Sequence, residues 1–206
     1  IFTPCNVGSG SGTTTLECPN IVAGSNGGGG ADPTVLCSNT CADLQASYPI
    51  IKDTSTYTVS SIPYAPPYQY GCMRNPVSVN VDDVWSNVIN LPFEFCFYGI
   101  NYSQFLIGSN GNITFDIISN PPGGYNPWSF NTNIPTTSLS LSTIFGVYHD
   151  IDPSKGGEIG WELITLPTGC RALVASWSNV PMFSDNAILY TGMMVLYENS
   201  NIIEVY

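Results

Sequence analysis

The sequence predicts an all-β protein, organised as an antiparallel β-sandwich with a loop-rich segment before it. Short apolar runs recur along the chain between turns rich in Gly, Pro and Asn. No run sustains the apolar spacing of an amphipathic helix, and residues 40–48 are the one modest helix candidate. Apolar residues form 43% of the chain, which is enough for a real core. Many short strands separated by such turns are typical of a sandwich.

The N-terminal part of the chain, residues 1–45, differs in composition from the rest. It contains the Gly/Ser run Gly8–Gly12, the glycine run Gly27–Gly30 and four of the seven cysteines. Gly/Ser-rich segments are flexible and bury little apolar surface. We therefore expect residues 1–45 to form a loop-rich, disulfide-pinned extension and residues 46–206 to form the sandwich module. Because the last strand-like run reaches Tyr206, we also expect the module to continue beyond it.

Strand signals recur at short intervals after this extension. The predicted strands are rich in β-branched and aromatic residues, and turn residues separate them. The triplet Ser109–Gly111 predicts a hairpin turn, because Asn-Gly readily adopts the backbone angles that tight hairpins require. In chain order, the predicted strands are 57–62, 88–98, 105–107, 113–117, 143–148, 158–163, 171–178, 192–197 and 201–206.

The charge of the chain argues against two classes of partner. The formal net charge is -11, and only four residues are Lys or Arg. Nucleic acids and anionic membrane surfaces bind clusters of Lys and Arg, so we expect neither as a partner. Only 9% of the residues are charged, so the surface is polar mainly through uncharged side chains. Such a surface is typical of extracellular proteins. No apolar run reaches the length of about 18 residues that a membrane-spanning helix needs.

The seven cysteines indicate an oxidising compartment, and therefore a secreted protein. Cys96 lies in an apolar run and is expected to be an inert buried thiol. Because seven is odd, one thiol stays free or pairs outside this chain. No C-x-x-C pair suggests a zinc site, and the spacing leaves the connectivity open. The disulfide candidates are Cys5, Cys18, Cys37, Cys41, Cys72 and Cys170.

The segment His149–Glu158 is the richest source of carboxylates. On an extended strand, Asp150 and Asp152 point to the same face roughly 6.5–7 Å apart, and Glu158 follows across a turn. These three side chains are candidate ligands for calcium, which prefers oxygen ligands. The alternative is that the aspartates accept hydrogen bonds from turn amides. The segment lacks the residue order of an EF-hand loop.

We expect no enzymatic activity from this chain. His149 is the only His available for a Ser-His-Asp triad, and no G-x-S-x-G motif accompanies it. Glycine motifs that bind phosphates or dinucleotides are absent, so no cofactor apart from calcium is expected. A glycan-acting hydrolase is kept as an alternative, because carboxylates near Asp150–Glu158 can converge with others from different strands.

Four aromatic residues in Pro/Gly-rich loops are candidates for ligand binding: Tyr64, Tyr68, Tyr125 and Trp128. Exposed Tyr and Trp in loops contact sugars or proteins at a low cost in conformational entropy. The alternative is that they cover sheet edges or pack on prolines. The sequence therefore also allows a carbohydrate-binding module.

Six segments within residues 46–206 form a specific set: Tyr57–Pro67, Asp82–Ser86, Leu91–Gly99, Ile107–Gly111, Ile144–Pro153 and Leu196–Tyr206. In this order they resemble the amino-terminal domain of large Bacteroidota surface proteins of the Flavobacteria type. Those proteins often carry a gliding-motility-type carboxy-terminal domain and leave the cell by type IX secretion. The family is expected to have a further Cys after Val180–Ser184. This chain has none there, so the resemblance supplies no partner for Cys170.

Three segments in the second half also resemble a nidogen-type extracellular module. They are Asn110–Phe115, His149–Asp152 and Trp177–Val180. This resemblance implies a nidogen-like β-sandwich found in adhesive surface proteins, with no catalytic residues to carry over.

Taken together, the residues and the resemblance predict a non-catalytic module of a larger secreted bacterial protein. We expect a role in cell-surface adhesion or motility, with filament formation by self-association included. The expected partners are other domains of the same protein and a surface protein or glycan. The expected location is extracellular, on the bacterial cell surface.

Overall fold

The computed structural model of the protein describes residues 54–77, 80–129, 131–167 and 169–206, and the backbone of three short strands before them. These residues contain no α-helix, and their helical turn is the 3-10 turn η1, Pro153–Lys155. Among them, no helix has the length and apolar character needed to cross a membrane. The strands are β1 Phe2–Pro4, β2 Val22–Ser25, β3 Leu44–Ser47, β4 Tyr57–Val59, β5 Asn75–Pro76, β6 Ile89–Phe97, β7 Ile100–Gly108, β8 Asn112–Thr114, β9 Thr143–Phe145, β10 Glu158–Thr165, β11 Arg171–Pro181, β12 Leu189–Tyr197 and β13 Ile203–Val205.

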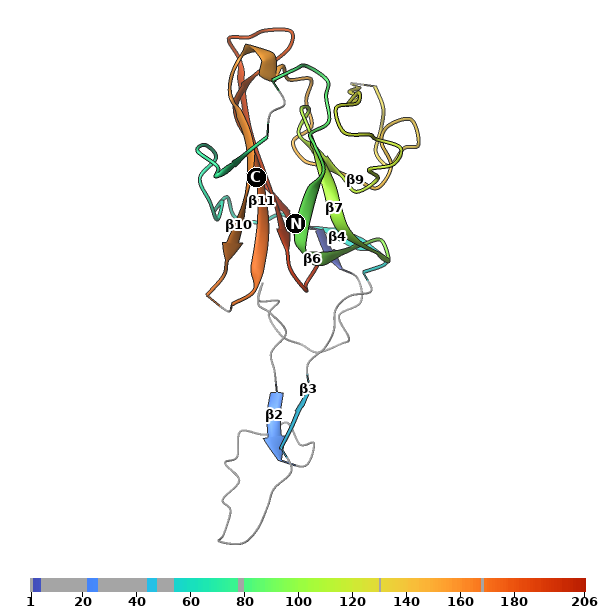
Figure 1. The fold of residues 1–206 in the computed structure, drawn as a ribbon, viewed down its shortest axis with the longest axis vertical. Helices are drawn as coiled ribbons and strands as arrows, with labels where there is room; N and C mark the ends of the chain where they lie inside the picture. The colour runs from blue at the N-terminus through green and yellow to red at the C-terminus, as the bar shows by residue number, and fades with distance from the viewer. Residues whose placement is uncertain are drawn as a thin grey trace, which may run out of the picture.

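The strands form two main antiparallel sheets (Figure 1). The larger sheet has seven strands in the order β4-β1-β13-β12-β11-β10-β5, and the smaller has four in the order β6-β7-β8-β9. Strands β2 and β3 pair with each other separately. The predicted all-β antiparallel sandwich is therefore confirmed. Residues 44–47, inside the modest helix candidate, form strand β3, so the helix prediction is wrong there.

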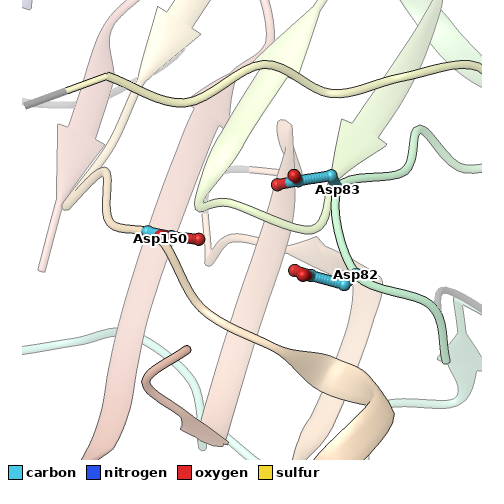
Figure 2. Close-up of side chains that lie close together, drawn as sticks. All are labelled: Asp82, Asp83 and Asp150. Atoms are coloured by element: carbon cyan, nitrogen blue, oxygen red, sulfur yellow. The ribbon is translucent and has the colours of Figure 1, made fainter. Parts of the chain in front are cut away.

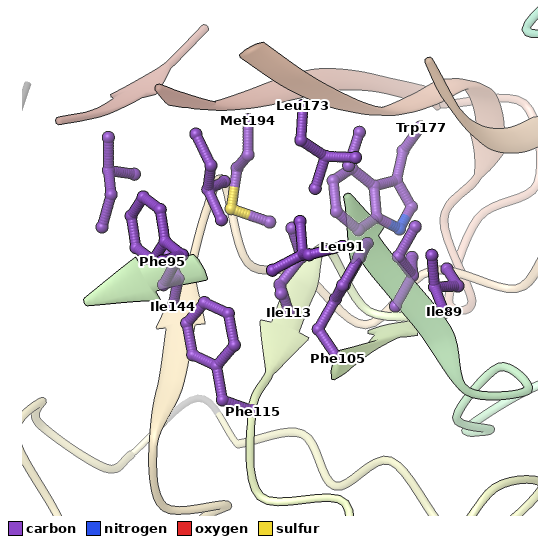
Figure 3. Packing of buried hydrophobic residues seen from close by; sticks show 14 of the residues in the cluster. Ile89, Leu91, Phe95, Phe105, Ile113, Phe115, Ile144, Leu173, Trp177 and Met194 are labelled. Atoms are coloured by element: carbon purple, nitrogen blue, oxygen red, sulfur yellow. The ribbon is translucent and has the colours of Figure 1, made fainter. Parts of the chain in front are cut away.

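The main core lies between the two sheets. Strand β6 alternates buried and exposed residues along most of its length, as a strand with one face toward a core does. Figure 3 shows its Ile89, Leu91 and Phe95 packed with side chains from the larger sheet, including Leu173 and Trp177. The Trp177 indole N–H donates to the backbone oxygen of Gly108 at 2.9 Å, which joins β11 of the larger sheet to β7 of the smaller one.

Strands β11 and β12 are buried on both faces. Leu173 of β11 and Leu196 of β12 belong to the main core, whereas Val174 and Val195 belong to a second cluster on the opposite face. The loop between β4 and β5 covers that cluster, with Tyr68, Tyr70 and Met73 packed against it. This cover explains why both strands are almost continuously apolar, because alternation is lost when both faces are buried.

The turn between β7 and β8 confirms the predicted hairpin at Ser109–Gly111. Ile107 pairs with Ile113, and Gly111 adopts a φ of 76°, which Gly accepts without strain. Strand β8 ends before the predicted 113–117 strand does, because the Asp116 carboxylate accepts the amide hydrogens of the turn that follows. Such side-chain bonds compete with strand pairing.

The structure divides the cysteines by their environment. Cys96 is a buried free thiol, which confirms the prediction for it. Cys72 is an exposed free thiol, which corrects its prediction as a disulfide candidate. Its backbone adopts a left-handed φ of 59°, and its backbone amide donates to Glu158 Oε2 at 2.7 Å. Cys170 is buried and disulfide-bonded.

The other candidates, Cys5, Cys18, Cys37 and Cys41, lie outside the described residues. The disulfide bonds predicted to pin the extension 1–45 involve these cysteines and so lie outside the described residues as well. The proposed boundary between the extension and the module 46–206 therefore stays a prediction.

Candidate metal centre

Three aspartates from two distant segments meet beside the β7–β8 hairpin. Asp82 and Asp83 lie in the turn before Val84, and Asp150 lies between β9 and η1. One carboxylate oxygen from each residue can be chosen so that all three atoms lie within 4.8 Å of one another. Figure 2 shows the three carboxylates pointing toward a common space. We call Asp82, Asp83 and Asp150 the aspartate cluster.

Hydrogen bonds donated by backbone amides hold the turn of Asp82 and Asp83 against the hairpin. The Val84 amide donates to Ser109 Oγ at 3.0 Å, and the Ser109 amide donates to the Val84 oxygen at 3.0 Å. The backbone amide of Asn126 donates to the backbone oxygen of Asp83 at 2.8 Å. Asp83 has a φ of 53°, a left-handed conformation that Asp tolerates better than most residues. Because the two neighbours lie in a turn and not in a strand, both carboxylates reach the same space.

Asp150 is positioned by the pairing of its segment with the end of β11. The Phe183 amide donates to the Asp150 backbone oxygen at 3.1 Å, and the Asp152 amide donates to the Pro181 oxygen at 2.8 Å. Ile151, between the two aspartates, is fully buried in the main core. The backbone on both sides of Asp150 is therefore fixed. The residue as a whole is 6% exposed.

Asn110 connects the two segments of the aspartate cluster. Its side-chain amide donates to Asp83 Oδ1 at 2.8 Å and to the backbone oxygen of Asn126 at 3.1 Å. Its side-chain oxygen accepts the Ile151 amide hydrogen at 3.2 Å. Asn110 is completely buried. An amide side chain is suited to this position because it both donates and accepts.

Negative charge accumulates at the aspartate cluster. Burial, followed by the nearby charges of Asp83, Asp152 and Asp150, raises the pKa of Asp82 to about 6. Burial, followed by Asp83 and Asp152, also raises the pKa of Asp150. One buried oxygen of Asp82 and one of Asp150 have no hydrogen-bond partner. Removing a carboxylate from water without a partner is costly, so the cluster favours a positively charged ligand.

The predicted calcium ligands do not come together as one group. Asp150 belongs to the aspartate cluster, but Asp152 caps η1 by accepting the Ser154 amide hydrogen at 2.9 Å. Glu158 accepts the amide hydrogen of Cys72 at 2.7 Å. Sequence reasoning missed Asp82 and Asp83 as partners of Asp150, because adjacent residues of an extended strand point to opposite faces. The signal that could have found them is the pair of consecutive aspartates, because aspartate is common in turns.

Glu158, which was considered for a glycan-acting hydrolase, and its neighbour on the strand, Glu162, both have structural contacts. Glu158 and Glu162 lie on one face of β10 and accept backbone amide hydrogens from the loop before β5. The Glu162 contact, with the Arg74 amide, is 2.6 Å long, and Glu162 is 4% exposed. The His149 ring packs edge-on against Tyr190 with 5.7 Å between ring centroids. These contacts attach the loop and the acidic segment to the larger sheet.

The four candidate ligand-binding aromatics separate into two places. The Tyr64 hydroxyl lies 2.9 Å from that of Tyr70, and the Tyr64 ring packs edge-on against Tyr206. Tyr68 is half-buried and packs against the second cluster. Tyr64 remains 75% exposed and offers most of its ring to solvent.

Tyr125 lies near the aspartate cluster, where it forms an isolated β-bridge with Val84. Tyr125 is 65% exposed, and its pKa is raised by burial and then by Asp83, Asp150 and Asp82. It lines a hollow of about 260 Å³ together with polar side chains such as Asn120. Trp128 is half-buried. The role of all four aromatics in binding stays a prediction.

Comparison with known families places the fold. A family model described as NIDO related matches residues 54–206. The chain belongs to the NIDO-related family. Searches of the curated proteins and of the solved structures found no match.

The NIDO-related match confirms the expected nidogen-like module and runs from before β4 to β13. It contains the aspartate cluster and the four loop aromatics. NIDO-related domains are a family of non-catalytic modules, and membership of this family indicates an extracellular module.

Proposed function

We propose that this protein is an adhesion or motility module of a larger bacterial cell-surface protein, exported by type IX secretion. Membership of the NIDO-related family over residues 54–206 carries the proposal. The Bacteroidota setting and the export route rest on the sequence resemblance of the same region. In this proposal the module presents loops to a surface protein or glycan, or to another copy of itself, while neighbouring domains anchor it.

The internal contacts of the polar residues support a binding role over a catalytic one. Glu158 and Glu162 hold a loop through its backbone amides, and Asp152 caps η1. Groups that serve catalysis must instead be free to exchange protons or attack a substrate. The low number of Lys and Arg residues agrees with a surface that contacts partners through uncharged polar groups.

An adhesion assay on coated beads tests the proposal. Beads carrying the purified 206-residue chain are expected to bind bacterial cells, host-surface proteins or each other more strongly than beads carrying an unrelated β-sandwich of similar acidity. In the encoding bacterium, deletion of the parent gene is expected to reduce surface attachment or spreading. Intact attachment and spreading after deletion, with no bead binding, would refute the adhesive role. Turnover of a polysaccharide or peptide by the purified chain would refute the non-catalytic one.

A carbohydrate-binding role is the second candidate, and the hollow beside Tyr125 favours it. An exposed aromatic ring next to polar side chains is a common arrangement for sugar recognition, because the ring packs on the apolar face of the sugar while polar groups bond its hydroxyls. Binding to a glycan array that is lost in Tyr125→Ala but kept in Tyr64→Ala would support this site. Equal loss in both variants, or no glycan binding at all, would refute it.

A further inference from the structure

We propose that the aspartate cluster binds one divalent cation and that this cation is Ca²⁺. The site would join the turn of Asp82 and Asp83 to the segment of Asp150. Neither the adhesive nor the glycan-binding role requires this ligand, so the calcium proposal can be tested independently of both.

The spacing of the carboxylates fits a single ion. Calcium binds oxygen ligands at about 2.3–2.6 Å, so two oxygens on the same ion lie no more than about 4.6–5.2 Å apart. One oxygen each from Asp82, Asp83 and Asp150 lies within 4.8 Å of the others. A small rotation of these side chains would let the three carboxylates contact one ion without a movement of the backbone.

An unpartnered buried oxygen gives an independent indication of a ligand. Asp150 is 6% exposed, and its Oδ1 atom is buried with no hydrogen-bond partner. Asp82 Oδ1 is in the same state. Figure 2 shows the Asp150 carboxylate directed toward those of Asp82 and Asp83. Buried carboxylates are normally paired with a cation or a metal ion, because an isolated buried charge is strongly disfavoured.

The basic residues within the described ranges are engaged elsewhere. Arg74 contacts Glu162 at 3.7 Å, Arg171 contacts Glu198 at 2.6 Å, and Lys155 contacts Asp152 at 4.0 Å. None of these three pairs includes a member of the aspartate cluster. The positive charge that would balance the cluster must therefore come from outside these pairs, and a metal ion supplies two charges in one small volume.

The chemistry of the donors selects calcium among divalent cations. All three donors are carboxylates, and hard oxygen donors favour Ca²⁺ and Mg²⁺ over metals that prefer imidazole or thiolate. Mg²⁺ requires near-octahedral geometry and loses its waters reluctantly, whereas Ca²⁺ accepts irregular ligand sets. Extracellular modules bind Ca²⁺ with dissociation constants of about 10⁻⁴–10⁻³ M, and we expect a value in this range here.

Calcium titration of the full chain tests the site. After removal of metal with EDTA, isothermal titration calorimetry is expected to show one Ca²⁺ per chain, with binding to Mg²⁺ at least tenfold weaker. A ligand that binds only the folded state raises Tm, and a tenfold excess of Ca²⁺ over the dissociation constant is expected to raise it by about 3–6 °C. The readout is therefore independent of adhesion and of glycan binding.

Variants of equal shape separate the cluster from the neighbouring acidic residues. Asp150→Asn and Asp82→Asn are expected to weaken Ca²⁺ binding at least tenfold and to abolish the rise in Tm. Because each removes one of several like charges, the metal-free variants are expected to unfold at the same temperature as the metal-free parent or higher. Glu158→Gln, which changes a carboxylate bonded to a loop amide, is the matched control and should keep the full response.

Three results would overturn the proposal. The first is the absence of any effect of Ca²⁺ on heat release or on Tm in the parent chain. The second is an unchanged calcium response in both Asp→Asn variants. The third is a loss of the response in Glu158→Gln with the cluster variants unaffected, which would place the ion elsewhere. Equal affinity for Mg²⁺ and Ca²⁺ would overturn the choice of calcium.

Discussion

Replacement of Asn110 by Ala is expected to lower the free energy of unfolding by about 3 kcal/mol. The side chain makes three hydrogen bonds. It donates to the Asp83 carboxylate and to the backbone oxygen of Asn126, and it accepts from the backbone amide of Ile151. Each contributes about 0.5–1.5 kcal/mol net, and loss of one partner in a buried pair leaves the other unsatisfied. Three bonds at about 1 kcal/mol each give the predicted loss. Asn110 is completely buried, so water does not readily replace the missing groups.

Urea unfolding at pH 7 in EDTA, followed by tryptophan fluorescence, measures this loss by linear extrapolation. Asn90→Ala is the matched control. Asn90 is exposed and accepts one hydrogen bond, from Gln104 at 2.8 Å, so its loss is expected to stay within about 0.5 kcal/mol. A loss below about 1 kcal/mol for Asn110→Ala, or equal losses in the two variants, would refute the assignment of Asn110 as the connection between the two segments.

Three further outcomes are expected. Gly108→Ala should destabilise the fold by about 1–3 kcal/mol in urea unfolding, because the added methyl group would collide with neighbouring asparagine side chains; an unchanged midpoint would contradict this. The ion pair with Arg171 lowers the pKa of Glu198, so its stabilising effect is complete above the ordinary pKa of 4.5 and is lost as the pH falls through the lowered folded-state value. Glu198→Gln should therefore cost roughly 1 kcal/mol at pH 7 and progressively less in acid, whereas a difference independent of pH would count against the pair. In native protein treated with a maleimide, peptide mass spectrometry should find Cys72 modified rapidly and Cys96 only after unfolding; equal rates would contradict their different exposure.

Much of the sandwich could be predicted because its local signals agree with its tertiary structure. The alternation in β6 reports directly that one face of the strand is buried, and the Asn-Gly pair reports the β7–β8 turn. Cys96 could be predicted as a buried thiol for the same reason, since it lies within the apolar part of β6. Each of these features depends on residues that are close together in the sequence.

The features that escaped prediction depend on long-range contacts. Continuous apolar runs in β11 and β12 indicate burial, but they do not reveal that the loop with Tyr68 and Tyr70 covers the outer face. The aspartate cluster brings together Asp82 and Asp150, which are far apart in the sequence. It depends on the left-handed backbone conformation of Asp83, which no local sequence pattern specifies. The position of Cys72 likewise depends on a bond to distant Glu158.

The order of the strands has a consequence for the behaviour of the protein at high local concentration. The larger sheet ends in β4, which has three residues, and in β5, which has two and includes Pro76. The smaller sheet ends in the short β9 and in β6, which contains Pro92 and the exposed Glu94. Short margins with proline or charge resist strand-by-strand fusion between neighbouring molecules. At high local concentration such modules can therefore touch one another through loops and side chains without forming a shared aggregate.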